Sequence, residues 1–81
     1  MNSSLIENLV DTFMGNSING IVDIDNYLIN NDINFIALPI EYDERKDIYY
    51  IDYTFQSDNI RMCGEIEGDE GRITRLEFIP L

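Results

Sequence analysis

Histidine is absent from the 81 residues, and cysteine occurs once, as Cys63. Activated Ser-His and Cys-His pairs and metal sites built on imidazole are therefore excluded. One cysteine forms no internal disulfide, and its place in an alternating apolar run predicts a buried structural thiol. Asp23-Ile24-Asp25 lacks the glycine of a calcium loop, and no glycine-rich loop is present to cradle phosphate. The sequence thus predicts no catalytic residue, no cofactor and no metal, and hence a protein that is not an enzyme.

Basic residues are scarce, since five Lys and Arg face sixteen Asp and Glu, for a formal net charge of −11. The electrostatic field of such a negative charge repels nucleic acid and membrane surfaces and attracts basic proteins. Solubility alone is the alternative reason for the charge. No apolar run approaches the ~18 residues of a membrane-spanning helix, and the first residues carry no basic segment of a signal peptide. We therefore expect a soluble, cytoplasmic protein that is a monomer when free.

Length and composition indicate one acidic domain over residues 1–81, of which 44% are apolar. Apolar side chains at helical spacing predict a helix over residues 5–14, capped by Ser4 and ended by Gly15. A second, shorter helix is expected to begin at Asp23. Between the two helices, residues 17–22 form either a short edge strand or a tight turn at Asn19-Gly20.

Four antiparallel strands are predicted over residues 33–42, 47–56, 60–67 and 72–79. Pro39 cannot donate to a strand ladder, which places the first of these strands at an edge or a bulge. Alternation gives the sheet one apolar face for the helices and one mixed face, with Thr74 on the first and Ile73 on the second. The predicted fold class is α+β, with two helices on one face of a mainly antiparallel sheet. The order is α-β-α-β-β-β-β with a short first strand.

The carboxylates gather at a few places along the chain. Alternate side chains of a strand lie about 6.6 Å apart, which is roughly two steps of one DNA strand at about 3.4 Å each. Extended acidic segments can therefore imitate a row of phosphates, whereas an ordinary solvated face is the alternative. The residues assigned to this acidic surface are Asp23, Asp25, Glu41, Asp43, Glu44, Glu65, Glu67, Asp69 and Glu70.

Three stretches combine this acidity with a particular order along the chain. They are Asn16-Ser17-Ile18 between the helices, Ile40-Glu41-Tyr42-Asp43-Glu44 before the second long strand, and residues 64–73 near the end. In this order they resemble the uracil-DNA glycosylase inhibitor family of phages and mobile elements. They are similar to its Glu-Ser-Ile motif, its Ala-Tyr-Asp-Glu hairpin corner and its final acidic hairpin.

The resemblance implies a DNA mimic that binds the DNA-binding groove of uracil-DNA glycosylase in a one-to-one complex, inside a bacterial host. It would thereby block the excision repair of uracil. Ser17 and Ile18 would match the inserted edge motif, while Asn16 departs from it because the family's acidic residue is missing. The family also has an apolar pocket that grips the side chain the enzyme wedges into DNA. Candidates for that pocket, with ordinary core as the alternative, are Ile24, Leu28, Ile51 and Tyr53.

Two other classes of function remain open. The same acidity fits an anti-CRISPR or anti-restriction protein, or an immunity protein that caps a basic nuclease toxin. A different class is a small-ligand or enzymatic domain, which would need a deep cavity over the face that carries Tyr49 and Tyr53.

Overall fold

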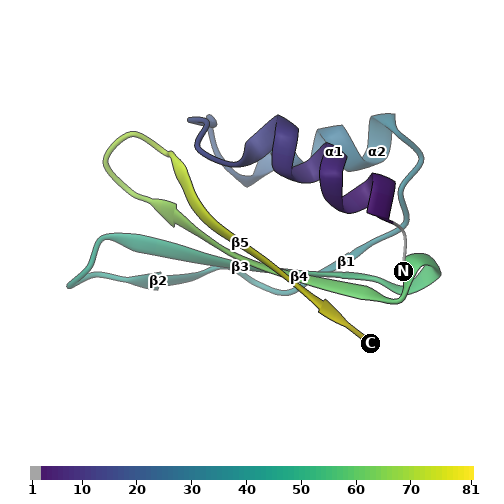
Figure 1. Cartoon of the computed structure of the whole chain (residues 1–81). Helices are drawn as coiled ribbons and strands as arrows, with labels where there is room; N and C mark the ends of the chain where they lie inside the picture. Colours follow the sequence, from purple (N-terminus) through teal and green to yellow (C-terminus); the bar gives the residue numbers. More distant parts are fainter. Residues whose placement is uncertain (1–2) are drawn as a thin grey trace.

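The computed structural model describes residues 3–81 and places two helices over one face of a five-stranded antiparallel sheet (Figure 1). β3 is the long strand that organises the sheet, because β1 and β2 both pair with it on one side and β4 pairs on the other, followed by β5. This arrangement confirms the predicted α+β class. The elements are α1 (Ser3–Phe13), α2 (Ile21–Asn30), β1 (Ile36–Ala37), β2 (Glu41–Asp43), β3 (Ile48–Phe55), β4 (Ile60–Glu67) and β5 (Ile73–Pro80).

Both helices begin earlier than the sequence predicts. Ser4 lies inside the first turn of α1 and is not its cap. α2 begins at Ile21 because Gly20 takes φ 128°, where the chain can turn directly into the helix. Asp23 therefore lies in the first turn, and its carboxylate accepts a 2.8 Å hydrogen bond from the Asn19 N–H.

The strand predicted over residues 33–42 is interrupted. β1 and β2 both pair with β3, and residues 38–40 lie between them, where the Leu38 N–H still donates to the Asp52 carbonyl oxygen at 2.9 Å. Because Pro39 has no backbone donor, the break falls where the sequence placed an edge or a bulge. The interruption frees Ile40 to lie beside Tyr49 at one end of the sheet.

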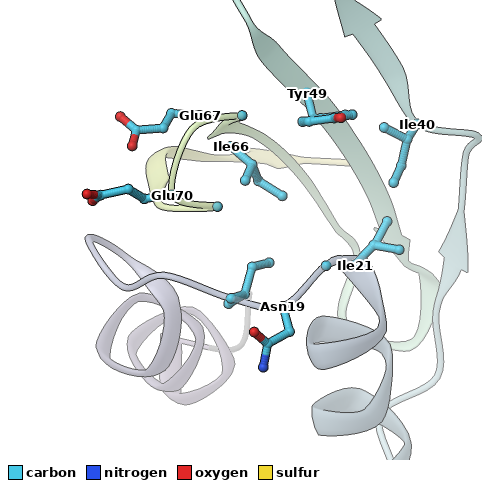
Figure 2. Close-up of a pocket in the computed structure, with 11 residues that line it drawn as sticks. Asn19, Ile21, Ile40, Tyr49, Ile66, Glu67 and Glu70 are labelled. Atoms are coloured by element: carbon cyan, nitrogen blue, oxygen red, sulfur yellow. The ribbon is translucent and has the colours of Figure 1, made fainter.

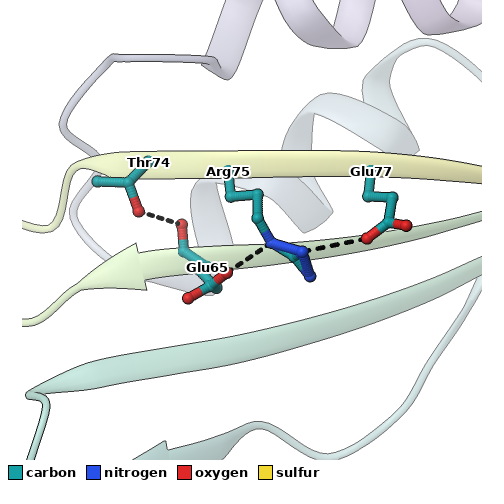
Figure 3. Close-up of polar contacts among 4 residues, drawn as sticks. All are labelled: Glu65, Thr74, Arg75 and Glu77. Carbon is teal, nitrogen blue, oxygen red and sulfur yellow. Dashed lines mark hydrogen bonds and ion pairs between the residues drawn. The ribbon is translucent and has the colours of Figure 1, made fainter.

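A β-bulge between β4 and β5 overturns one part of the predicted alternation. Glu65 pairs with Arg75 whereas Ile66 pairs with Ile73, so Thr74 is the extra residue. Ile73 consequently faces the core and is fully buried, while Thr74 is exposed. The Thr74 hydroxyl donates to the Glu65 carbonyl oxygen at 3.4 Å (Figure 3).

The core lies between the helices and the inner face of β3, β4 and β5. Twelve apolar side chains of the described residues are buried there, including Leu9 and Phe13 of α1. The Phe13 ring meets the Tyr27 ring of α2 edge-on, with centroids 5.2 Å apart, which ties the two helices together. Neither helix of residues 3–81 is long and apolar enough to cross a membrane.

Candidate functional site

Three loops meet at one end of the molecule (Figure 1). They are the loop after α1, the hairpin between β2 and β3, and the turn between β4 and β5. The Ile18 N–H donates to the Gly71 carbonyl oxygen at 2.9 Å, and the Gly68 N–H donates to the Asp47 carbonyl oxygen at 2.8 Å. The turn after β4 is thus hydrogen-bonded to both of the other loops. Parts of the chain far apart in sequence are held in one surface, which we call the loop end.

The segment after α1 forms a minimal edge strand at the loop end. Ser17 makes an isolated antiparallel bridge with Arg72. Gly15 donates to the Ile73 carbonyl at 2.8 Å, and Ile73 donates back to the Asn16 carbonyl at 2.9 Å. The chain then bends at Asn19-Gly20, so each of the two alternatives for this segment describes part of it. Ser17 is exposed, and Ile18 is half-buried.

Gly71 allows this edge to form. Its φ of 67° lies in the left-handed region, and a Cβ at this position would lie 2.5 Å from the Ile18 carbonyl oxygen. A side chain would therefore push the Ile18 backbone away from the turn. The placement of the edge segment depends on a glycine more than fifty residues away in sequence.

An apolar pocket of about 360 Å³ lies between the edge segment, the start of α2 and the sheet (Figure 2). Glu67 and Glu70 project at one side of it, away from the apolar side chains (Figure 2). The pocket is therefore lined by apolar side chains and has a negatively charged rim, which is formed by Glu67 and Glu70. The apolar side chains are Ile18, Ile21, Ile40, Tyr49 and Ile66.

The four side chains that were predicted to line a pocket belong to one cluster, but this cluster is the buried hydrophobic core of the described residues. Ile24, Leu28, Ile51 and Tyr53 are each at most 2% exposed. The Tyr53 hydroxyl donates to Asp25 Oδ1 at 2.6 Å, and burial followed by this hydrogen bond raises the pKa of Tyr53 far above its usual value. The observed pocket lies nearer the loop end, where Tyr49 precedes Ile51 by two residues on the same face of β3. Sequence alternation placed Tyr49 and Ile66 on the inner face without indicating that the helices leave this end open.

Several of the predicted surface carboxylates have a local structural partner. Asp23 accepts from Asn19, and Asp25 accepts from Tyr53. The Asp43 carboxylate accepts from the Arg45 and Lys46 N–H groups at 3.0 and 3.1 Å, which shapes the hairpin. These three side chains therefore hold loops and helix in place.

Glu65 and Glu70 are paired with arginines. The Glu65 carboxylate lies 2.5 Å from Arg75, which also contacts Glu77 at 3.1 Å (Figure 3). Glu70 lies 2.9 Å from Arg72. The carboxylates of the predicted set whose side chains make no hydrogen bond or ion pair within residues 3–81 are Glu41, Glu44, Glu67 and Asp69.

Charge is distributed unevenly between the two faces. No Lys or Arg precedes Arg45, so both helices carry acidic and no basic side chains. The open face of the sheet instead holds Arg61 and Arg75, each paired with carboxylates. Arg61 Nε donates to Asp52 Oδ1 at 2.9 Å, a second contact joins the two groups, and this pairing lowers the pKa of Asp52. Of the unpaired carboxylates of the predicted set, Glu44, Glu67 and Asp69 lie at the loop end, and Glu41 lies beside the open face.

The open face also carries a wider depression of about 560 Å³, lined in part by Leu38, Tyr50 and Arg61. Of its charged side chains, Asp52, Arg61 and Arg75 are held in ion pairs, whereas Glu41 has none within residues 3–81. Cys63 lies here half-buried, which corrects its predicted place in the core, because its strand alternation turns it to the outer face. Burial raises the pKa of the Cys63 thiol, which keeps it protonated at neutral pH.

No family model, no curated protein and no solved structure matches this chain. Its function is therefore a proposal, argued from the site and from the resemblance that the three stretches carry.

Proposed function

We propose that the protein is a non-enzymatic inhibitor that mimics DNA and binds the DNA-binding groove of uracil-DNA glycosylase. The observation that carries the proposal is the meeting of three features at the loop end. These are the Ser17–Ile18 edge, an apolar pocket, and carboxylates that have no counter-charge of their own. A groove built for DNA offers basic side chains to phosphates and an apolar side chain to the base stack, and the loop end complements both.

Electrostatics favours a basic protein as the partner. The net charge of −11 attracts a positive groove over long range and speeds encounter. Glu44, Glu67 and Asp69 surround the loop end without internal ion pairs. Their desolvation on binding is best compensated by cations of the partner, and this favours a basic protein over a neutral or acidic one.

The pocket supplies the apolar part of the contact. An aliphatic side chain entering it would lose water together with Ile18, Ile40 and Tyr49. Burial of apolar area contributes about 25 cal/mol per Å², so one inserted Leu-sized side chain provides an anchor of roughly 2 kcal/mol. This is the role that the resemblance gives to the residue the glycosylase wedges into DNA.

The choice of uracil-DNA glycosylase among basic enzymes rests on the resemblance. Its three stretches are distant in sequence, and all three border the loop end, through Ser17–Ile18, Ile40 and the turn at Gly68–Gly71. An anti-CRISPR, anti-restriction or immunity protein would share the acidity without needing this convergence. A small-ligand domain is less favoured because Tyr53 is buried in the core, and the pocket beside Tyr49 is open and bordered by the carboxylates of Glu67 and Glu70.

The test is a uracil-excision assay in which the protein is titrated against a fixed amount of glycosylase. We expect excision to fall linearly and to stop near one equivalent, with co-elution of the two proteins on gel filtration. Full activity at a large excess of the protein, with no co-elution, would refute the glycosylase as target.

A further inference from the structure

One row of side chains crosses four strands at the loop end. Tyr42 pairs with Tyr49, Tyr49 with Ile66, and Ile66 with Ile73, so all four point to the same face. Exposure falls along the row from 48% at Tyr42 and 38% at Tyr49 to 6% at Ile66 and 0% at Ile73. The buried end of the row belongs to the core, whereas its two tyrosines extend the apolar pocket outward to solvent.

The two tyrosines are held in place. Their ring centroids lie 4.5 Å apart at an interplanar angle of 33°. The Tyr42 hydroxyl donates to Asp47 Oδ1 at 2.6 Å, and the Asp47 carbonyl in turn accepts from the Gly68 N–H. The hydrogen bond to Asp47, together with partial desolvation, raises the pKa of Tyr42 to about 12, so the phenol remains a neutral donor. The pair is therefore a preformed aromatic surface rather than two independent side chains.

We propose that this tyrosine pair binds an arginine side chain of the protein partner at the mouth of the apolar pocket. The inference rests on the proposed function for the partner being a basic protein, and it adds the residue type and the place of contact. A guanidinium is planar and weakly hydrated, and it stacks on an aromatic face while its N–H groups remain free to donate. Its aliphatic stem would cover Tyr49 and Ile40, and its positive charge would lie in the negative field of the loop end, where Glu67 has no internal partner.

The charge of the surroundings decides between possible occupants. An anionic group would meet Glu67, Glu70 and Asp47 on the same surface. A second copy of this chain would bring another net charge of −11 to the contact. An aliphatic side chain of the partner can fill the pocket below the rings, but it offers no cation to Glu67, which has no ion pair among residues 3–81. An arginine that stacks on the two rings supplies the positive charge that this surface lacks.

The wild-type protein allows a direct test by NMR titration with a capped Gly-Arg-Gly tripeptide. A citrulline tripeptide is the matched probe, since citrulline keeps the shape of arginine and lacks its charge. We expect saturable shifts of the Tyr42 and Tyr49 ring signals with arginine, and smaller ones with citrulline. Tyr42→Leu should raise the dissociation constant of the arginine peptide about 2- to 5-fold, which is the equivalent of an exposed cation–π contact of about 0.5–1 kcal/mol. Tyr50→Leu on the opposite face should leave binding unchanged.

Equal shifts with arginine and citrulline, or shifts that map to the helices and not to the tyrosine rings, would overturn the arginine site. The result is independent of the glycosylase assay. Inhibition without a response to the arginine peptide would remove only this inference. A response to arginine without inhibition would remove the glycosylase and keep the site.

Discussion

The Tyr53 hydroxyl donates a 2.6 Å hydrogen bond to Asp25 Oδ1 and so joins the middle of β3 to α2. Tyr53 is fully buried, and Asp25 is half-buried above it. A carboxylate that the sequence assigns to the binding surface therefore also fixes the helix over the sheet. Since Gly20 and Ile21 at the start of α2 line the apolar pocket, the same bond helps to set the shape of the loop end.

Tyr53→Phe removes that bond and leaves the Asp25 carboxylate without its donor. Because the acceptor is charged, we expect the free energy of unfolding to fall by about 1.5 kcal/mol. Denaturant unfolding followed by circular dichroism measures the change. Tyr50→Phe is the matched control, since the Tyr50 hydroxyl has no hydrogen bond within residues 3–81. A loss of equal size in the two variants would contradict this role for Tyr53.

Gly71→Ala should displace the edge segment. Two effects destabilise the variant. An alanine in the left-handed backbone conformation costs about 1–2 kcal/mol, and its Cβ would lie 2.5 Å from the Ile18 carbonyl oxygen. Gly15→Ala is the matched control. Gly15 has φ 78°, so the backbone effect is the same, but a Cβ there would have no atom within 4 Å. We therefore expect Gly71→Ala to be the more destabilising by about 1–3 kcal/mol, with faster amide exchange at Ile18. Equal stability of the two variants would show that the edge does not depend on Gly71.

The Asp52–Arg61 pair predicts a particular pH dependence. Hydrogen bonding to Arg61 lowers the pKa of Asp52 in the folded protein, so the pair stabilises the fold at pH above the ordinary aspartate value of about 4. That stability is lost as pH falls through the lowered folded pKa. Asp52→Asn should cost about 0.5–1 kcal/mol at pH 7, since the Arg61 side chain is 43% exposed and solvent screens the pair.

The difference between Asp52→Asn and wild type should shrink toward zero as pH falls through the lowered folded pKa of Asp52, below which both side chains are neutral. Glu44→Gln is the control for net charge, because it removes one carboxylate that has no internal partner. It should be neutral or slightly stabilising at pH 7, since it relieves repulsion in a chain of net charge −11. A pH-independent loss in Asp52→Asn would show that the ion pair is not its cause.

Ile40→Glu places a charge inside the apolar pocket and should weaken inhibition of the glycosylase by about tenfold or more, because the charge would be desolvated without a partner. Ile36→Glu is the matched control. Ile36 is exposed to a similar degree, 52% against 40% for Ile40, and lies outside the pocket. Titrations of uracil excision compare the two variants. Inhibition that is reduced to the same extent in both would argue against the pocket as an anchor.

Much of the fold was predictable because it depends on local patterns. The alternation of β3 and β4 and the left-handed stop at Gly15 lie within single segments of the chain. The inward position of Ile73 was not predictable, since it depends on a bulge whose register is set by pairing with β4. Alternation within one strand contains no information about an extra residue relative to its neighbour.

The positions of the candidate site residues were predictable only in part. Ser17 forms an isolated bridge to Arg72, but Ile24 and Leu28 are core. Periodicity indicates which side chains face inward and not where the covering helices stop. The loop end depends on tertiary contacts such as Gly68 with Asp47, which no local signal specifies.

Competition with DNA tests the central claim most directly. A fluorescent uracil-containing duplex bound to a catalytically inactive glycosylase is titrated with the protein, and its anisotropy is followed. If the protein is a DNA mimic, the duplex is released completely near one equivalent, and added DNA restores binding only in excess. A duplex that remains bound while the protein binds the same enzyme molecule would contradict the account, because mimic and DNA would then occupy different surfaces.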